Sequence, residues 1–410
     1  MYNIAIALYA FVVRLVSPFN KKAQKMLSGQ KKTFALLEKE IDPKASYIWF
    51  HAASLGEFEQ GCPLIEKIKK EKSEYKILLT FFSPSGYEAR KNYSGVDLIC
   101  YLPFDFFRNA TKFLDLARPA IAIFIKYEFW MNYLCQLKKR NIPTYIISAI
   151  FRPNQIFFRW YGKAYRKVLK NFKWFFLQDA NSKELLKTLD IRDNITVAGD
   201  TRFDRVQEIY RQQKKIRMVD KFLNRTSNKS FALVAGSTWE EDEAIILPYF
   251  NVTPEMKLII VPHEVNEDRL KAIASKLKRP FVRYSQAKED EIQEASCLII
   301  DCIGLLSYIY RYGDIAYIGG GFGVGIHNIL EPAVYGIPVL FGTNYRKFKE
   351  AKELIDCKGG VSISAPDVFA SRMNEYLAYN FLLQEAGKSA KSYVERNLGA
   401  THKIYEKIFS

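Results

Sequence analysis

Residues 317–342 read YIGGGFGVGIHNILEPAVYGIPVLFG, and this is the most informative stretch of the chain. It predicts an apolar strand, a glycine turn, the start of a helix and a second apolar strand at 338–340. Glycine lets the backbone approach a ligand closely, and a helix N-terminus offers free N–H groups and a positive dipole to a phosphate. The stretch lacks the lysine of a P-loop and does not open a domain. It therefore predicts a phosphate site in the second of two α/β halves.

The candidate ligands in this turn are backbone groups and two polar side chains. Gly320, Gly321 and Gly323 would bring the backbone close to a phosphate, and Asn328 and Glu331 stand together where the helix begins. A phosphate site so placed is typical of an enzyme that acts on a nucleotide-sugar. The alternative is a glycine turn that only allows a helix to pack on a sheet.

Strands and amphipathic helices alternate through the rest of the chain, which predicts parallel sheets covered by helices on both faces. The strands are expected at 47–51, 76–82, 120–125, 144–148 and 175–178, and again at 231–235, 258–261, 297–300, 315–318 and 338–340. The expected fold class is α/β, with two Rossmann-like, doubly wound domains facing one another across a cleft. Ligands are expected at the carboxyl ends of the strands.

The domain boundary is predicted from a change in composition. Residues 205–229 are polar and charged, carry few strand signals and end in a loop. Residues 34–210 would form the first Rossmann-like domain. Residues 211–410 would form the second, including a helical end at about 366–409. A chain of 410 residues is long enough for two domains.

The N-terminus is apolar but short. Residues 3–19 read NIAIALYAFVVRLVSPF, in which Arg14 is the only charge, and lysines follow at 21, 22, 25, 31 and 32. The uninterrupted apolar stretch 4–13 is much shorter than the roughly 20 residues of a membrane-spanning helix. We do not expect a signal peptide, because no positive residue precedes this stretch. An apolar helix followed by lysines predicts an interfacial membrane anchor at residues 1–33. The alternative is a helix docked on the protein's own core.

The chain is basic, with a net charge of +17 and a pI of about 9.3. This balance favours a phosphorylated substrate, an anionic membrane or nucleic acid as the partner. Residues 151–174 interleave Arg and Lys with aromatic residues, which predicts contact with a membrane or acceptor phosphates, a solvated helix, or contact with nucleic acid. Six scattered cysteines and four histidines show no metal-ligand spacing, so no metal is expected.

Two carboxylates are expected at the ends of neighbouring strands. Glu57 ends the segment HAASLGE after the first core strand, and Glu128 follows the strand at 120–125. A helix N-terminus lowers and burial raises the pKa of such a carboxyl, which can then serve as a general base for a hydroxyl group. Glu128 would orient Glu57 or that hydroxyl group. The alternative for each is a helix-capping role, and Glu59 is expected to be solvated.

Further candidates for binding an anionic ligand lie in the second half and near the junction. Ser237 and Thr238 follow a strand in AGSTWEEDE, where hydroxyl and N–H groups suit a phosphate and also suit a helix cap. Arg202, in GDTRFD, would reach the ligand from the junction, or would pair with a neighbouring aspartate. His263, in VPHE, follows a core strand and has a structural role as its alternative.

Taken together, these segments resemble the 3-deoxy-D-manno-octulosonic acid (Kdo) transferases of lipopolysaccharide assembly. HAASLGE resembles the family's H-S-V-S-V-G-E, and KYEFWMNYL resembles its E-T-E-L-W-P-N-L. Further segments match in the same order, namely GDTRFD, AGSTWEEDE, DCIGLL and GGGFGVGIHNILEPAVYGIPVLFG. The resemblance runs from the N-terminal segment to about residue 349, and the ordered set is far more specific than any one motif.

The resemblance implies a GT-B glycosyltransferase with its acceptor in the N-terminal domain and its donor in the C-terminal domain. It implies inverting transfer of Kdo from CMP-Kdo to a lipid A precursor, lipid IVA, at the cytoplasmic face of the inner membrane, with Glu57 as the base. No metal, other cofactor or nucleic acid is expected. Donor binding is implied for Arg202, Ser237, Thr238, His263, Gly320, Gly321, Gly323, Asn328 and Glu331, and acceptor binding for Ser54, Gly56 and Lys126.

Two departures from the family pattern stand out. Lys126 occupies a position where the family commonly has a glutamate, so only Glu128 carries over from that motif. The segment VPHEVNEDR replaces P-R-H-P-E-R, which leaves the alignment of His263 and Arg269 open. Two other functions remain as alternatives: a GT-B glycosyltransferase with a UDP-sugar donor, and a non-catalytic basic protein that binds a membrane or nucleic acid.

Overall fold

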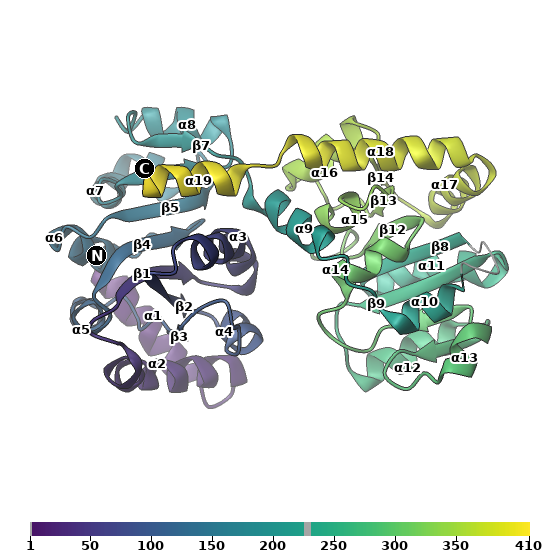
Figure 1. The fold of residues 1–410 in the computed structure, drawn as a ribbon, viewed down its shortest axis with the longest axis horizontal. Coiled ribbons are helices and arrows are strands. Elements are labelled where there is room, and N and C mark those ends of the chain that lie inside the picture. The colour runs from purple at the N-terminus through teal and green to yellow at the C-terminus, as the bar shows by residue number, and fades with distance from the viewer. Residues whose placement is uncertain (1, 225–230) are drawn as a thin grey trace. The chain divides into compact units, whose positions relative to one another are not determined.

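The computed structural model describes residues 2–224 and 231–410, and the chain folds into two compact units (Figure 1). Unit 1 runs to Arg205 and also includes Leu398–Ser410, and unit 2 is Val206–Asn397. The division falls inside helix α9 (Thr201–Arg211), a few residues before the predicted boundary at 210. The end of the predicted linker, at 225–229, lies outside the described residues.

Unit 1 is built on a seven-stranded parallel sheet in the order β3-β2-β1-β4-β5-β6-β7. Its central strands are short apolar runs that are buried on both faces, as a parallel sheet requires. The strands are β1 (Ser46–Ala52), β2 (Tyr75–Phe81), β3 (Leu98–Tyr101), β4 (Pro119–Ile125), β5 (Thr144–Ala149), β6 (Trp174–Leu177) and β7 (Ile195–Val197).

Helices cover both faces of this sheet (Figure 1). Successive side chains of a strand point to opposite faces, so Trp49 belongs to one apolar cluster and Phe50 to the other. Besides the first part of α9, the helices are α1 (Tyr2–Val16), α2 (Lys21–Glu40), α3 (Leu55–Glu71), α4 (Pro84–Arg90), α5 (Phe107–Ala117), α6 (Met131–Lys139), η1 (Ile156–Phe158), η2 (Trp160–Gly162), α7 (Lys163–Leu169), α8 (Ala180–Lys187) and α19 (Ala400–Phe409).

Unit 2 has a second seven-stranded parallel sheet, in the order β10-β11-β9-β8-β12-β13-β14. Its strands are β8 (Phe231–Thr238), β9 (Met256–Pro262), β10 (Phe281–Arg283), β11 (Cys297–Ile299), β12 (Ile315–Ile318), β13 (Val339–Phe341) and β14 (Gly360–Ser362). Its helices are α10 (Arg217–Leu223), α11 (Glu240–Val252), α12 (Glu267–Lys276), α13 (Glu289–Glu294), α14 (Leu306–Ile309), η3 (Tyr310–Tyr312), α15 (Leu330–Ala333), α16 (Lys349–Asp356), α17 (Pro366–Ala378) and α18 (Asn380–Arg396).

Each sheet has a central switch point in its strand order, between β1 and β4 in unit 1 and between β8 and β12 in unit 2, and in unit 2 β11 also lies between β9 and β10. In open α/β sheets, ligands bind outside the carboxyl ends of the strands at such a switch point. Glu57 and Glu128 follow β1 and β4, while Ser237 is the second-last residue of β8 and Gly320 follows β12. The predicted doubly wound α/β class is thus confirmed, and the candidate residues lie where each sheet can bind a ligand.

The C-terminal helix corrects the predicted domains. α19 lies on unit 1, although the sequence analysis assigned it to the second domain. Ile404 and Ile408 join an apolar cluster of unit 1. The carboxylate of Asp204 accepts hydrogen bonds from the N–H groups of Gly399 and Thr401, both at 2.7 Å, and so caps the helix. The sequence did not reveal this placement because an amphipathic helix can cover either sheet.

The N-terminal helices show one docked face and one exposed face. Ala10 of α1 packs in a cluster with Tyr101 and Phe104, whereas Leu8 and Leu15 are 63% and 58% exposed. In the described part of the chain, no single helix has the length and apolar composition of a membrane span; α1 and α2, bent by 118°, reach that threshold only as a pair. α2 also continues beyond residue 33, and a membrane role for residues 1–33 stays a prediction.

Candidate functional site

Glu57 lies in the first turn of α3, directly after the carboxyl end of β1. Ser54 is the N-cap residue of this helix. The Oε2 atom of Glu57 accepts hydrogen bonds from the backbone N–H groups of Ala53 and Ser54, at 2.6 and 3.2 Å. A glutamate three residues after a serine N-cap is the capping-box pattern. The capping alternative is therefore present, and it fixes the carboxylate at the edge of the sheet.

The surroundings of Glu57 raise its pKa to about 7. Burial is the largest cause because it disfavours the charged form, and the nearby carboxylate of Glu128 acts in the same direction. The N–H group of Ala53 and the charge of Lys126 lower the pKa and oppose these effects. A carboxyl group with a pKa near 7 can take up a proton at physiological pH, as a general base must.

Glu128 lies in the turn after β4 and is fixed by two aromatic side chains. Its Oε2 atom lies 3.2 Å from Nε2 of His51 and accepts a hydrogen bond from Nε1 of Trp130. His51 is fully buried, and its Nδ1 atom lies 2.9 Å from the hydroxyl of Thr80. The sequence analysis did not single out His51, although its position near the carboxyl end of β1 was a usable signal. These contacts hold Glu128 in one orientation.

The residues predicted on the acceptor side border Glu57 and Glu128. Lys126 has a left-handed backbone with φ 68°, a conformation that costs a residue with a side chain about 1–2 kcal/mol. Its N–H group donates to the carbonyl of Ile147 at 2.9 Å. Gly56 is exposed, and a Cβ atom there would have no neighbour within 4 Å. The surface beside Ser54 and Glu57 is therefore open, and acceptor contact remains a prediction.

The structure places Arg202 in unit 1, at the beginning of α9. Nε and Nη2 of its guanidinium donate to the Oδ2 atom of Asp200 at 2.9 and 2.6 Å. The ion pair that the sequence analysis gave as the alternative is therefore formed. Donor binding by Arg202 stays a prediction, and it would require the guanidinium to contact the donor in addition to Asp200.

Ser237 and Thr238 lie at the carboxyl end of β8 and differ in environment. Ser237 has a left-handed φ of 54° and is partly exposed. Thr238 is buried, and its hydroxyl donates to Glu243 at 2.9 Å. Glu243 in turn pairs with Arg269 at 2.5 Å, which gives Arg269 a structural role. Thr238 thus supports the loop, and Ser237 is the hydroxyl group at the edge of the sheet.

Asp242 holds the glycine turn from within unit 2. Its carboxylate accepts hydrogen bonds from the N–H group of Gly320 and from the hydroxyl of Tyr317, both at 2.9 Å. It also accepts a hydrogen bond from the N–H group of Trp239. Burial raises the pKa of Asp242, while these donors oppose the shift. The segment AGSTWEEDE indicated only a phosphate site or a helix cap, and no local pattern revealed the contact of Asp242 with the turn.

Close backbone packing accounts for two of the glycines. A Cβ atom on Gly319 would lie 2.2 Å from the carbonyl oxygen of Ser237, and one on Gly321 would lie 2.4 Å from the nitrogen of Gly342. Gly320 has φ 87°, which favours glycine. Gly323 is different, because a Cβ atom there would meet no atom within 4 Å. The packing alternative therefore holds for part of the turn, and the backbone at Gly323 is accessible.

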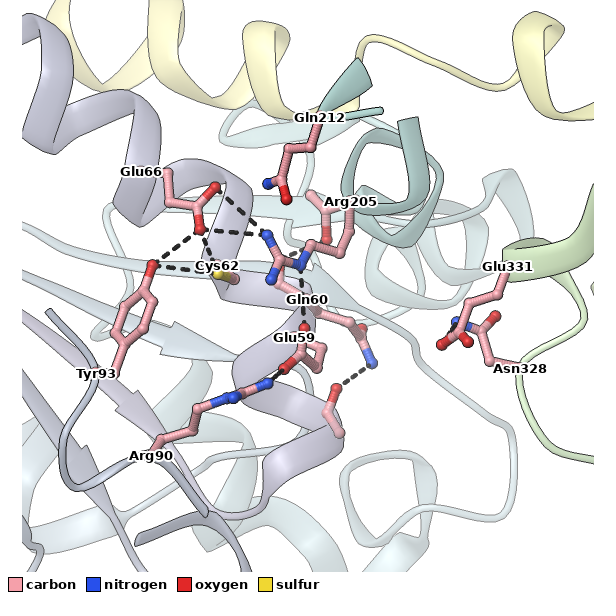
Figure 2. A network of polar contacts seen from close by, with 12 residues as sticks. Glu59, Gln60, Cys62, Glu66, Arg90, Tyr93, Arg205, Gln212, Asn328 and Glu331 are labelled. Carbon is pink, nitrogen blue, oxygen red and sulfur yellow. Dashed lines mark hydrogen bonds and ion pairs between the residues drawn. The ribbon is translucent and has the colours of Figure 1, made fainter. Parts of the chain in front are cut away.

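The helix expected to begin near Asn328 and Glu331 is present, but it is short. Residues 322–329 form turns and loop, and α15 (Leu330–Ala333) is a single short turn. Asn328 and Glu331 do lie together, since Nδ2 of Asn328 donates to Oε1 of Glu331 at 3.1 Å (Figure 2). Any phosphate contact at this position would thus come from the backbone of the turn and from side chains.

Three aromatic rings stack beside the glycine turn. The ring of His263 stacks on both Trp239 and His327, with centroid distances of 4.7 and 4.5 Å. Nε1 of Trp239 donates to Nε2 of His327 at 3.4 Å, and the N–H group of His327 donates to the carbonyl of Gly319. Burial, together with His263, lowers the pKa of His327 to about 4, so this ring is neutral at physiological pH. The stack and the turn form one surface of unit 2.

A polar network joins α3 to the first half of α9 in unit 1 (Figure 2). Arg205 pairs with Glu59 at 3.1 Å and with Glu66 at 3.2 Å, and Arg90 pairs with Glu59 at 2.6 Å. The expectation that Glu59 is solvated is therefore wrong. Sequence spacing could not reveal this network because Arg205 is far from α3 along the chain.

Two doubly wound units with polar groups at their switch points define a protein of the GT-B class. Residues 28–205 match the model of the 3-deoxy-D-manno-octulosonic-acid transferase (Kdo transferase) family. The Kdo transferase of Aquifex aeolicus is 28% identical over 339 residues, which cover 81% of this chain and 86% of that protein. The Kdo transferase of Haemophilus influenzae is 25% identical over 378 residues, covering 89% and 87%. The resemblance predicted from the sequence is thus confirmed over most of the chain.

A longer relative shows the same segment as part of a larger protein. The bifunctional glycosyltransferase/methyltransferase of Fusobacterium nucleatum is 28% identical over 384 residues, which cover 90% of this chain. The matched region spans only 58% of that relative's length.

Solved structures share the fold at low sequence identity. The UDP-GlcNAc 2-epimerase from Neisseria meningitidis, bound to UDP-GlcNAc, has a TM-score of 0.62 at 16% identity, covering 89% of this chain and 99% of that one. Another UDP-N-acetylglucosamine 2-epimerase has a TM-score of 0.59 at 12% identity, covering 89% and 96%. At such identities, the likeness shows the fold alone.

Proposed function

We propose that this protein is a glycosyltransferase that moves Kdo from CMP-Kdo to a lipid A precursor, lipid IVA. The observation that carries the proposal is Glu57, a largely buried carboxyl group with a pKa of about 7 at the switch point of the unit 1 sheet. The relatives described as Kdo transferases support Kdo as the sugar that is transferred. The segment HAASLGE, on which the resemblance partly rests, contains this carboxyl group.

In the proposed reaction, Glu57 accepts the proton of a hydroxyl group of the acceptor. The oxygen of that hydroxyl group attacks the anomeric carbon of Kdo at the same time. The new C–O bond forms as the bond between that carbon and the phosphate oxygen of CMP breaks, and CMP leaves with the electron pair. A single displacement of this kind inverts the anomeric configuration. A well-placed general base contributes about 10²–10⁴-fold to such a rate.

In this proposal, unit 2 binds the donor. The exposed turn at Gly323 leaves room for the phosphate, although the N–H group of Gly323 itself donates to the carbonyl of Gly320 at 3.2 Å. The hydroxyl of Ser237 suits the phosphate, because preorganised dipoles stabilise the charge that develops on the leaving group. The ring of His263 offers an aromatic surface to the nucleobase, and Asn328 and Glu331 suit the ribose hydroxyls. Among residues 2–224 and 231–410, no three His, Cys, Asp or Glu side chains are grouped to hold a metal ion, and metal-independent transfer is part of the proposal.

The acceptor in this proposal is a phosphorylated lipid at the cytoplasmic face of the inner membrane. The net charge of +17 favours an anionic surface. Exposed apolar side chains of α1, such as Leu8 and Phe11, suit the interface between head groups and acyl chains. Trp160, which is 88% exposed within the basic stretch 151–174, is a further side chain of the kind found at membrane interfaces. Nucleic acid is not required by this arrangement.

A UDP-sugar donor is the second candidate, since solved structures with this fold are described as bound to UDP-GlcNAc or UDP. Calorimetric titration of the full chain with CMP and with UDP separates the two. We expect saturable binding of CMP, weaker binding of UDP, and weaker CMP binding in Ser237→Ala. Ser389→Ala in α18, another serine-to-alanine change in unit 2, is the matched control. Tighter binding of UDP would favour the second candidate, and absence of nucleotide binding by folded protein would contradict both.

A further inference from the structure

A cavity of about 460 Å³ opens in unit 1 between α1, α2 and the loop that follows β3. Its apolar lining includes Leu27 and Phe34 of α2 and Phe104 of the loop. Its polar lining includes two cations, Arg14 of α1 and Lys31 of α2. The reaction proposed above does not use any of these groups, so the cavity requires an explanation of its own.

Gln30 supplies the second observation that points to a ligand. This residue lines the cavity and is only 7% exposed. The Nε2 atom of its amide is buried and has no hydrogen-bond partner among the described residues. A buried donor without an acceptor opposes folding, and most buried polar groups are satisfied in native proteins. An oxygen acceptor bound in the cavity would satisfy it.

The two cations indicate which chemical group supplies that acceptor oxygen. Arg14 and Lys31 are both exposed at the cavity. In the described chain, neither is paired with a carboxylate of the protein. Two cations and an amide donor suit a phosphate group, whose oxygens accept charge-assisted hydrogen bonds.

The surface around the cavity indicates what carries the phosphate. Leu15 and Phe19, which flank the Arg14 end of the cavity along the chain, are 58% and 93% exposed. Phe107, at the beginning of α5 beside the lining residue Phe106, is 57% exposed. Apolar side chains next to a cationic cavity are the arrangement that meets a lipid at the boundary of head groups and acyl chains.

We propose that this cavity binds the phosphate head group of an anionic membrane lipid, with the acyl chains lying against α1. The Nε2 group of Gln30 donates to a phosphate oxygen, and Arg14 and Lys31 neutralise the phosphate charge. The apolar walls exclude water from these contacts, which strengthens them. This site binds one lipid molecule independently of sugar transfer, and it adds a specific contact to the general attraction between a basic protein and an anionic membrane.

The test uses the full chain and a soluble short-chain lipid, dihexanoyl phosphatidylglycerol, below the concentration at which it forms micelles. Calorimetry should show saturable binding of one molecule per chain. Gln30→Leu changes no charge, and we expect it to weaken binding at least about ten-fold, which corresponds to the loss of one hydrogen bond to a charged group. Lys31→Gln should weaken it to a similar extent. Lys32→Gln is the matched control, because Lys32 is the next residue of the same helix, is exposed and does not line the cavity.

Three results would overturn the proposal. The first is equal loss of binding in Lys31→Gln and Lys32→Gln, which would indicate diffuse charge attraction. The second is unchanged binding in Gln30→Leu when thermal unfolding shows that variant to be folded. The third is equally tight binding of inorganic phosphate, which would assign the cavity to a free anion rather than a lipid. Vesicles of phosphatidylglycerol should show the same ranking of variants by cosedimentation, and the ranking should be absent with phosphatidylcholine vesicles.

Discussion

Two charged neighbours of Glu57 set the pH dependence that we expect for sugar transfer. A base must be deprotonated, so kcat/KM should rise with pH through the pKa of about 7. Glu128→Gln removes a negative charge that raises this pKa, and the acidic limb of the pH–rate profile should move to lower pH. Lys126→Gln removes a positive charge that lowers the pKa, and the limb should move to higher pH.

The two variants should shift the acidic limb in opposite directions. This makes the prediction specific, because general damage to the site would not produce opposite shifts. Glu71→Gln, at the end of the same helix α3, is the matched control and should leave the profile in place. Shifts in the same direction for both variants would show that another group controls the acidic limb.

The raised pKa of Glu57 also predicts a gain of stability when the carboxyl group is removed. Folding favours the protonated form of this group. The stabilisation that it contributes is therefore fully present below its pKa in the unfolded chain, and it is lost as the pH rises through about 7, the pKa in the folded protein. Glu57→Gln avoids this loss and should be more stable than the wild type at pH 8, by about 3 kcal/mol at most. The two proteins should differ less at pH 5. Denaturant unfolding at both pH values measures the difference, and a less stable variant at pH 8 would contradict the assigned pKa.

Two glycines of the same turn should respond differently to alanine. Gly321→Ala would place a Cβ atom 2.4 Å from the backbone of Gly342, whereas Gly323→Ala meets open space. We expect Gly321→Ala to lose about 1–3 kcal/mol of stability through the forced backbone shift, and Gly323→Ala to change it little. Thermal unfolding of both variants provides the comparison. Equal effects would mean that the turn does not pack against Gly342 as described.

Among individual residues, the sequence predicted those whose position along the chain reveals their role. Glu57, Glu128 and Ser237 each lie at the end of a strand, and strand ends are visible as the limits of apolar runs. His51 and Asp242 were missed because their roles depend on partners across the sheet, such as Thr80 for His51 and Gly320 for Asp242. No local pattern encodes such a pairing.

Among the elements, α19 depends on a cap supplied by α9. Asp204 accepts hydrogen bonds from two N–H groups at the beginning of α19. Asp204→Ala should lower the stability of unit 1 by about 1–2 kcal/mol and free the last residues for proteolysis. Asp204→Asn keeps an acceptor oxygen and should lose less. Thermal unfolding and limited proteolysis test this, and an unchanged C-terminus in Asp204→Ala would show that the apolar contacts of Ile404 and Ile408 suffice.

The elements that the sequence predicted best are the central strands, because burial on both faces makes them continuous apolar runs. In each sheet the strands that were missed are the edges, β3 and β7 in unit 1 and β10 and β14 in unit 2. Edge strands are partly exposed and short, so their sequences resemble loops. For α15 the sequence predicted only a helix start, and the helix ends after the four residues LEPA.

For the whole molecule, the proposed function assigns a different task to each unit. Unit 1 supplies the carboxyl group of Glu57, and unit 2 supplies the glycine turn and the aromatic stack that includes His263. Each unit has its own sheet and apolar core, so a substitution in one site should leave ligand binding at the other intact. This separation allows binding and chemistry to be measured in the same variant.

The proposed function is tested by a transfer assay with the purified chain of 410 residues, CMP-Kdo and lipid IVA, read by mass spectrometry. We expect the wild type to add the mass of at least one Kdo residue to the lipid. Glu57→Gln should lose most of this transfer while calorimetry shows unchanged CMP binding. Folded wild-type protein that leaves lipid IVA unmodified, or a Glu57→Gln variant that transfers Kdo at the wild-type rate, would contradict the account.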